Sequence, residues 1–400
     1  MIPLQVERRG RWVLDAIGAR DLAIGDGVAY QPDAWGAIER GERPEGDLVA
    51  EAFYDLARVE ELAARRDAHG RFRAAWSSLD PLDPPLERLR RDLGLLPPTW
   101  DGATFAVALT HDVDSVRRWT AIGLRGAAAR LKDDVLARRP GPALREARGL
   151  ALAPVHKLRG TDPNWRFSEI VHETRRHGAS GCTFFVLGGH TDPHDGAAPE
   201  VYERLRPRLV DELRELEAEV GLHGSYRSAR DVRLLAEEKR RLDELDVRVA
   251  GHRYHYLRVD PHHNLEALAE VGLRYDSTLG FADSLGFRAG LARPFRPWDF
   301  ALDEPLDIVE LPLAAMDATL AEPRFFGLSP RAAWPLLDGL LTLAQMCRAG
   351  FAVLWHPERF DRATAGGWDA LYWRFLDEVK RRGGRCMPAA ELVELWLDMQ

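Results

Sequence analysis

From residue 102 to the end of the chain, short apolar runs alternate with longer segments whose apolar residues recur at helical spacing. Short apolar runs bounded by polar or glycine-containing segments are typical of buried strands in a parallel sheet. The pattern therefore predicts repeated βα units. We expect strands at 104–109, 181–187, 219–222, 247–251, 272–276, 307–311, 351–355 and 385–387. We expect helices at 166–177, 199–218, 229–245, 263–271, 331–349, 367–382 and 389–398, and a helical insertion at 115–165.

The first hundred residues lack this alternation. They contain two helical patterns, at 47–65 and 84–94, and no catalytic constellation. We therefore expect a small N-terminal α+β extension over residues 1–101. An α/β domain with a closed or nearly closed parallel sheet should follow over residues 102–400.

Four of the predicted strands end in polar side chains that can carry chemistry. The residues at or just beyond these ends are Asp112 and Asp114, then His223, then Arg253 and His255, and finally His356. A lone histidine at a strand end is most often structural. The carboxyl ends of parallel strands form one face, however, and ligands bind there, so we expect these side chains to meet.

The pair Asp112 and Asp114 is the most informative of these features. Two carboxylates held close together repel, so a cation or a proton must lie near them. A metal-assisted hydrolase needs such a pair, with one carboxylate on the metal and the other free to accept a proton from water. The alternative is structural: one aspartate caps the next helix and the other lies in its first turn.

Composition narrows the possible functions. The formal net charge of −8 argues against a nucleic-acid-binding protein. The three cysteines show no ligand spacing, so we expect free thiols and a reducing compartment. No apolar stretch approaches the length of a membrane span, and the first residues show no signal-peptide pattern. We therefore expect a cytoplasmic protein without a membrane span.

In order and spacing, the strand ends resemble the motifs of the NodB-homology polysaccharide deacetylases, carbohydrate esterase family 4. The segments that resemble the five motifs are Thr110–Asp114, His223–Ser225, Arg253–Tyr256, Tyr275–Thr278 with Trp298–Asp299, and Leu354–His356. The first hundred residues resemble the extra domain of a bacterial subgroup that carries Thr-His-Asp-Val-Asp. The resemblance implies a distorted (β/α)7 barrel with one active site at the carboxyl ends of its strands.

The resemblance also implies roles for the site residues. A divalent metal, expected to be zinc, would polarise an N-acetyl carbonyl and bind water. Asp112 would be the catalytic base, Arg253 the group that orients it, and His356 the general acid. Asp114 and His223 would be metal ligands.

The expected third metal ligand is missing. The position at which the family carries a second histidine holds Arg227, which cannot ligate a metal. We predict that His255 replaces it, because His255 and Arg253 project to the same side of an extended segment. His111 is a second candidate, and weak or absent metal binding is a third possibility.

The sequence thus predicts a hydrolase that removes an acyl group, expected to be acetyl, from an amide of an amino sugar or glycoconjugate precursor. The alternatives are an inactive carbohydrate-binding protein on the same fold, or a hydrolase of another non-peptide C–N bond. Asp317 could be structural or part of the site, and Glu358 could orient His356 or cap a helix. The polar loop 188–195 could contact the substrate, but we interpret it as a solvated turn.

Overall fold

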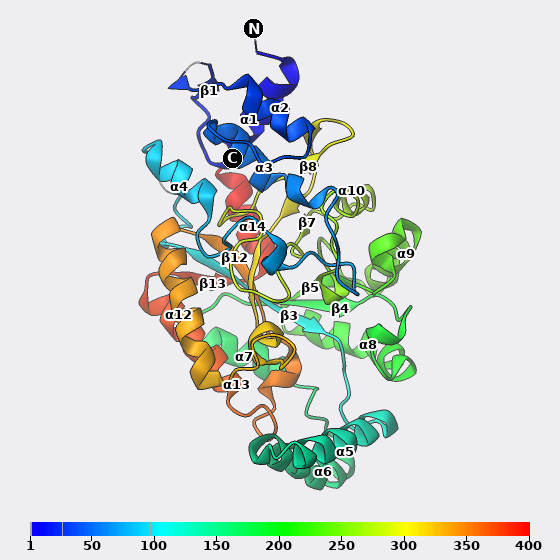
Figure 1. Cartoon of the computed structure of the whole chain (residues 1–400). Helices are drawn as coiled ribbons and strands as arrows, with labels where there is room; N and C mark the ends of the chain where they lie inside the picture. Colours follow the sequence, from blue (N-terminus) through cyan, green and yellow to red (C-terminus); the bar gives the residue numbers. More distant parts are fainter. Residues whose placement is uncertain (1, 26, 96–97) are drawn as a thin grey trace.

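The computed structural model describes residues 2–25, 27–95 and 98–400. A parallel sheet with helices around it forms the centre of the molecule (Figure 1). Its strands are β3 (Ala106–Val113), β4 (Thr183–Leu187), β5 (Glu219–Gly224), β6 (Gly251–Tyr254), β7 (Tyr275–Asp276), β10 (Val309–Glu310), β11 (Leu313–Met316), β12 (Gly350–Leu354) and β13 (Arg385–Met387). Every residue of β3, β4 and β12 is buried, as expected for strands covered on both faces.

The sheet closes into a barrel. Its strands run in the order β10-β7-β6-β5-β4-β3-β12-β11, all pairs are parallel, and β13 pairs with the start of β3. The two strands at the ends of this order, β10 and β11, are separated in the chain only by Leu311 and Pro312. Leu311 donates a backbone hydrogen bond to Asp276 of β7, and Pro312 accepts one from Ala352 of β12. One extended segment therefore joins both edges, and the expected distorted parallel barrel is confirmed, with eight strands in this order where seven were expected.

The helices that follow the barrel strands lie around it. They are α7 (Phe167–Arg176), α8 (Pro199–Glu215), α9 (Val232–Asp243), α10 (Leu265–Glu270), α11 (Asp317–Ala321), α12 (Pro330–Cys347), α13 (Trp368–Arg381) and α14 (Ala389–Asp398). In α13 the buried residues Leu371, Phe375 and Val379 recur every four positions, which is the spacing of one helix face. At the start of α9, Asp231 accepts hydrogen bonds from the backbone N–H groups of Arg233 and Leu234, a cap that contributes about 1 kcal/mol.

Two strands differ most from the sequence prediction in a limit that bears on the site. β3 was expected at 104–109 but extends to Val113, and β6 was expected at 247–251 but begins at Gly251. The extension carries polar side chains, which stay in the barrel because each is satisfied there. Thr110, for example, donates from Oγ1 to the carbonyl of Val353 at 2.7 Å. Several site residues therefore lie on the strands themselves rather than after them.

The N-terminal region packs on one end of the barrel. It contains α1 (Leu4–Ala16), the parallel pair β1 (Ala23–Ile24) and β2 (Gly27–Val28), α2 (Pro32–Glu39), α3 (Leu48–Leu56) and α4 (Pro85–Asp92). Neither α1 nor α2 was predicted. Trp12 and Phe53 pack against Trp298 of the antiparallel hairpin β8 (Trp298–Asp299) and β9 (Glu304–Pro305). A buried ion pair of 2.6 Å between Glu61 and Arg288 adds a second link to the barrel.

The expected helical insertion consists of two helices, α5 (Ala121–Leu136) and α6 (Pro140–Arg159). Thr120 caps α5 by accepting a hydrogen bond from the N–H of Gly123, and Gly160 ends α6 in the left-handed conformation. The two helices form a hairpin at the far end of the molecule from the N-terminal region (Figure 1).

Candidate metal and catalytic site

The polar strand ends meet at one end of the barrel, as the parallel topology requires. Asp112, Asp114, His255 and His356 line a cavity of about 410 Å³. His223 lies beside them, and its Nε2 atom is 3.3 Å from Oδ1 of Asp114. The structure thus brings all five side chains to one place, and the cavity gives a substrate access to them.

Three of these side chains present ligand atoms to a common point. The ligand atoms of Asp114, His223 and His255 all lie within 4.8 Å of one another. Oδ1 of Asp114 and Nε2 of His223 are buried without a properly aligned hydrogen bond, although they lie 3.3 Å apart. Buried polar atoms without partners are unfavourable unless something else satisfies them. A divalent cation would satisfy both atoms, so the residues present fit a metal.

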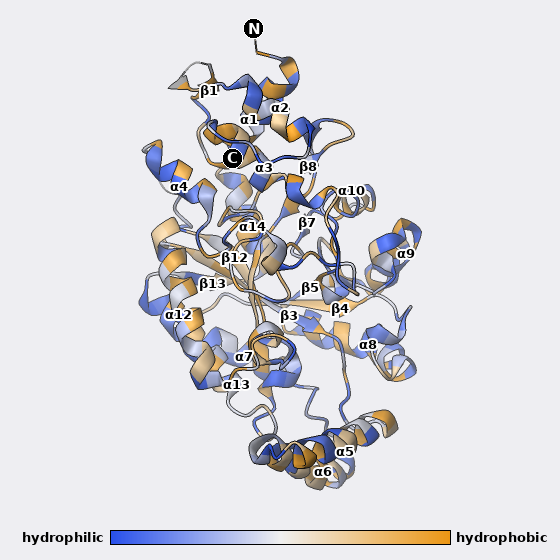
Figure 2. Ribbon diagram, viewed as in Figure 1, coloured by the Kyte–Doolittle hydropathy of each residue, from blue (hydrophilic) through white to orange (hydrophobic). Residues whose placement is uncertain are grey.

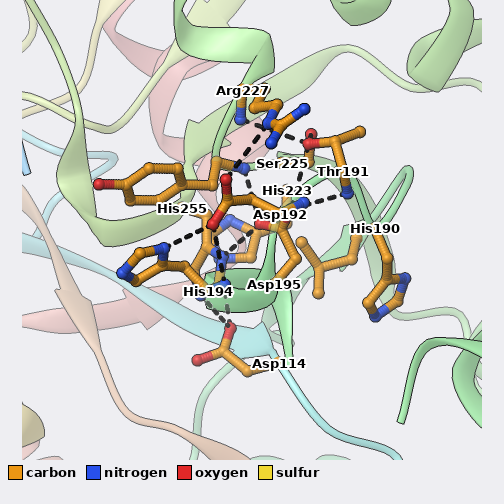
Figure 3. A network of polar contacts seen from close by, with 12 residues as sticks. Asp114, His190, Thr191, Asp192, His194, Asp195, His223, Ser225, Arg227 and His255 are labelled. Carbon is orange, nitrogen blue, oxygen red and sulfur yellow. Dashed lines mark hydrogen bonds and ion pairs between the residues drawn. The ribbon is translucent and has the colours of Figure 1, made fainter. Parts of the chain in front are cut away.

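Each histidine of this group is held by its other ring nitrogen. Nδ1 of His223 donates to the backbone carbonyl of Arg253 at 2.9 Å. Nδ1 of His255 lies 2.9 Å from Oδ1 of Asp195, a carboxylate with no exposed surface (Figure 3). A donor at Nδ1 leaves the lone pair of Nε2 for the site, which is how outer hydrogen bonds orient metal-binding histidines.

The role of Asp195 corrects the sequence interpretation of loop 188–195. Asp195 lies in this loop, but its carboxylate is buried and accepts hydrogen bonds from the backbone N–H groups of Thr191, Asp192 and Tyr226. These bonds and His255 hold the pKa of Asp195 below its usual value, although burial opposes this shift. The signal in the sequence was the pair Asp192 and Asp195, which forms a reciprocal capping box around a short turn.

Arg227 does not occupy the site. Its side chain is 65% exposed, and its Nε atom lies 3.2 Å from Asp192. Figure 3 shows Arg227 and Asp114 at opposite ends of the polar network. The arginine at the expected histidine position therefore does not bring its charge to the three ligand atoms.

His111, the other candidate for the third ligand, is a structural residue. Its Nδ1 atom donates to the carbonyl of Trp355 at 2.6 Å, and its ring stacks on Phe184. Its Nε2 atom lies 3.4 Å from the hydroxyl of Tyr372. Burial lowers the pKa of His111 to about 4, so the ring is neutral. Both nitrogens face away from the group formed by the ligands, so the expectation that His111 could be a ligand is wrong.

Asp112 is held by a fully buried arginine. The guanidinium of Arg253 donates to Oδ1 of Asp112 and to Oγ1 of Thr110, each at 2.8 Å. Its remaining nitrogens donate to the carbonyl and hydroxyl of Ser277. The free oxygen of Asp112, Oδ2, lies 3.7 Å from Nε2 of His223. This carboxylate is therefore fixed with one oxygen turned towards the ligand group.

His356 is held by Asp317. Its Nδ1 atom lies 2.6 Å from Oδ1 of Asp317, whose other oxygen accepts a hydrogen bond from Arg359. Burial alone would lower the pKa of His356, but the Asp317 carboxylate outweighs burial and raises this pKa to about 10. Nε2 of His356 lies 3.7 Å from Oδ2 of Asp114. Asp317, and not Glu358, orients His356, which resolves the ambiguity that the sequence left.

The remaining cavity wall combines barrel and N-terminal residues. Glu358 lines the cavity. Its burial and, to a smaller extent, the nearby charge of Asp114 raise its pKa to about 7. Tyr256 lines the cavity from a left-handed backbone conformation at φ 62° and contacts His69 of the N-terminal region. Arg71, also N-terminal, lines the same cavity. The first hundred residues thus contribute to the site although they contain no catalytic constellation.

Comparison with known proteins gives distant structural similarities only. No family model and no curated protein match the chain. A Mycobacterium smegmatis protein named as a polysaccharide deacetylase is 21% identical, with a TM-score of 0.49 over 76% of this chain and 94% of its own. A Pseudomonas aeruginosa protein of the same name is 15% identical, with a TM-score of 0.49 over 80% and 98%. The peptidoglycan deacetylase PdaC of Bacillus subtilis is 11% identical, with a TM-score of 0.31 over 76% and 95%. The chemistry of this chain is therefore inferred from its own side chains.

Proposed function

We propose that this chain is a metal-dependent hydrolase of the NodB-homology deacetylase type. Its reaction would remove an acyl group, expected to be acetyl, from the amide of an amino sugar or glycoconjugate precursor. One observation carries the proposal. The three ligand atoms of Asp114, His223 and His255 converge within 4.8 Å, next to a carboxylate held by an arginine and a histidine held by a carboxylate.

Asp114, His223 and His255 would hold the metal. One carboxylate and two imidazoles form a common protein ligand set of catalytic zinc, which leaves a position for water or substrate. When bound there, the metal would supply Lewis acidity that polarises the amide carbonyl and makes water easier to deprotonate. Burial opposes ionisation of Asp114, but the adjacent histidines hold its pKa well below the usual value, so the carboxylate is charged.

Asp112 is suited to be the general base. Its Oδ1 atom is occupied by Arg253, so Oδ2 is the oxygen that would accept the proton of the attacking water. Arg253 is itself held at four points by Thr110, Ser277 and Asp112. We therefore regard Arg253 as a positioning residue, which keeps the base in one orientation without touching the substrate.

His356 is suited to be the general acid. An amide nitrogen is a poor leaving group unless it receives a proton as the C–N bond breaks. Asp317 keeps the imidazole charged and oriented, so its Nε2 atom would donate that proton on the cavity side. Amide hydrolysis requires both a base and an acid. The site offers a carboxylate, Asp112, for the first role and an imidazole, His356, for the second.

The rival interpretation, an inactive binding protein, rested on Arg227. Because Arg227 pairs with Asp192 at the exposed edge of the loop, it gives no reason to expect a blocked metal position. A binding module also has no need for both a held base and a held acid.

The test is release of acetate from N-acetylated amino sugars and their oligomers by zinc-loaded protein. We expect Asp112→Asn and His356→Ala each to lower kcat by about 100-fold or more. Asp377→Asn is the matched control, because Asp377 is an exposed carboxylate that pairs with the surface residue His177. Unchanged activity in Asp112→Asn and His356→Ala would overturn the roles. Hydrolysis of cyclic amides in place of acetylated sugars would support the rival C–N hydrolase.

A further inference from the structure

The hairpin of α5 and α6, residues 121–159, differs in charge from the rest of the protein. It contains nine Lys and Arg residues against three Asp and Glu, a net charge of +6 in a chain whose total is −8. Six of the basic side chains are exposed and form no ion pair with any described residue. They are Arg125, Lys132, Arg138, Arg148, Lys157 and Arg159.

The hairpin also exposes apolar side chains. Of the sixteen large apolar side chains exposed among the described residues, seven lie in this segment of 39 residues. They are Ile122, Leu124, Val135, Leu136, Leu144, Val155 and Leu158. Figure 2 shows hydrophobic and hydrophilic positions interspersed along α5 and α6, at the end of the molecule away from the N-terminal region. Isolated exposed apolar residues are ordinary, but such a concentration marks an interaction surface.

Several of the exposed apolar residues share a helix face. Leu124 and Val135 are eleven residues apart on α5, and Leu144 and Val155 are eleven residues apart on α6. Eleven residues make about three helical turns, so each pair lies on one face of its helix. Leu158, which is 88% exposed, extends the face of α6. Leu144, Val155 and Leu158 therefore form an exposed apolar stripe on α6, whereas the exposed apolar residues of α5 lie on two faces, Leu124 with Val135 and Ile122 with Leu136.

We propose that this hairpin binds the surface of a membrane that contains anionic lipids. Helices with apolar side chains on one face and basic side chains beside it lie in the membrane interface, with their cations at the lipid headgroups. No described helix is long and apolar enough to cross a bilayer, so the contact is with its surface. A second copy of the chain would bring two faces of net charge +6 together, and a nucleic acid would leave the leucines uncovered.

The surface adjoins the candidate site. Arg118, which precedes α5, donates to Thr364 at 2.9 Å and lies 3.2 Å from Glu146 of α6. Arg118 and Glu146 both line the cavity. The hairpin therefore connects the exposed apolar surface to one wall of the cavity, and the proposal does not depend on the reaction catalysed there.

Co-sedimentation of the full chain with vesicles tests the proposal. One set of vesicles is phosphatidylcholine alone, and the other contains about one third phosphatidylglycerol. We expect the chain to bind the anionic vesicles. Binding should be about tenfold weaker or more with the neutral vesicles, and also with the anionic vesicles at about 0.5 M salt, since salt screens the charges. The triple variant Leu144→Ser, Val155→Ser, Leu158→Ser and the charge reversal Arg148→Glu, Lys157→Glu, Arg159→Glu should each lose binding by a similar factor.

The matched control is Leu82→Ser with Leu302→Ser, two exposed leucines outside the hairpin, which should bind as the wild type does. Unchanged zinc content and helical circular dichroism show that each variant is folded. The proposal is overturned if the chain sediments with neither vesicle, or if both hairpin variants still bind. It is also overturned if the chain does not bind vesicles but forms a concentration-dependent dimer that the serine variant abolishes. Tighter binding to duplex DNA than to anionic vesicles would overturn it too.

Discussion

Oδ1 of Asp195 lies 2.9 Å from Nδ1 of His255, so a carboxylate in the loop after β4 orients the imidazole that follows β6. The carboxylate is itself fixed by three backbone N–H groups. His255 consequently has only Nε2 available to the site, 3.6 Å from Oδ1 of Asp114. This pair explains how a third ligand can exist where the expected histidine position holds Arg227.

Replacing Asp195 by asparagine should weaken metal binding. Asparagine keeps the size of the side chain but removes the charge that fixes the ring of His255. We expect the Kd for zinc to rise by about 10- to 100-fold, the usual effect of losing such an outer partner. Competition with a chelating dye measures this affinity without any substrate.

The control is Asp377→Asn, which removes a carboxylate from the surface residue His177 and should leave the Kd for zinc unchanged. Equal zinc affinity in Asp195→Asn and wild type would show that the hydrogen bond does not matter for the metal.

The proposed hydrolase activity should decline on the alkaline side as His356 loses its proton. Burial opposes the charge of His356, but Asp317 raises its pKa to about 10, so the acid form persists below that pH. Asp317→Asn removes the stabilising charge and lowers this pKa. The alkaline limb of kcat should therefore move to lower pH by about one unit or more, as a pH–rate profile would show. An alkaline limb at the same pH in both proteins would exclude His356 as the acid.

His111 should make the fold sensitive to acid. Burial lowers its pKa to about 4, against about 6.5 in an unfolded chain, so only the unfolded chain binds a proton between these values. The free energy of unfolding therefore falls as pH falls through this window, by about 3 kcal/mol from this residue. His111→Asn keeps a donor for the carbonyl of Trp355 but does not titrate. Between pH 7 and pH 4, the free energy of unfolding measured in urea should fall less in the variant than in the wild type. An equal fall would contradict the assignment of His111 as a neutral buried residue.

Removing Arg253 should destabilise the protein as well as inactivate it. Its loss leaves the buried carboxylate of Asp112 without its partner, and breaking a buried pair in this way costs about 3–5 kcal/mol. Urea unfolding of Arg253→Ala measures the change. Arg227→Ala, which removes an exposed arginine, should change the free energy of unfolding by no more than about 0.5 kcal/mol. A similarly small effect for Arg253→Ala would mean that Asp112 does not depend on it.

Much of this architecture could be predicted from the chain. The apolar runs identified the barrel strands because strands covered on both faces must be apolar along their length. The rule that parallel strands end on one face then brought Asp112, Asp114, His223 and His356 together. The alternation of side chains along an extended segment placed Arg253 and His255 on the same side.

The missing parts depend on contacts between distant segments. Asp317 lies 39 residues before His356 and Asp195 lies 60 residues before His255, so neither pair shows as a local pattern. Asp195 looked like a solvent-exposed turn residue because only the folded barrel buries it. The strand β3 was expected to end at 109, since nothing in the sequence shows that Arg253 and the carbonyl of Val353 satisfy its polar residues.

Zinc content tests the central claim most directly. Elemental analysis after incubation with zinc and dialysis would compare wild type, Asp114→Ala, His255→Ala and Arg227→Ala. We predict about one zinc per chain in wild type and Arg227→Ala, and loss of zinc in Asp114→Ala and His255→Ala. No zinc in the wild type, or zinc retained by His255→Ala and lost by Arg227→Ala, would contradict a metal centre formed by Asp114, His223 and His255.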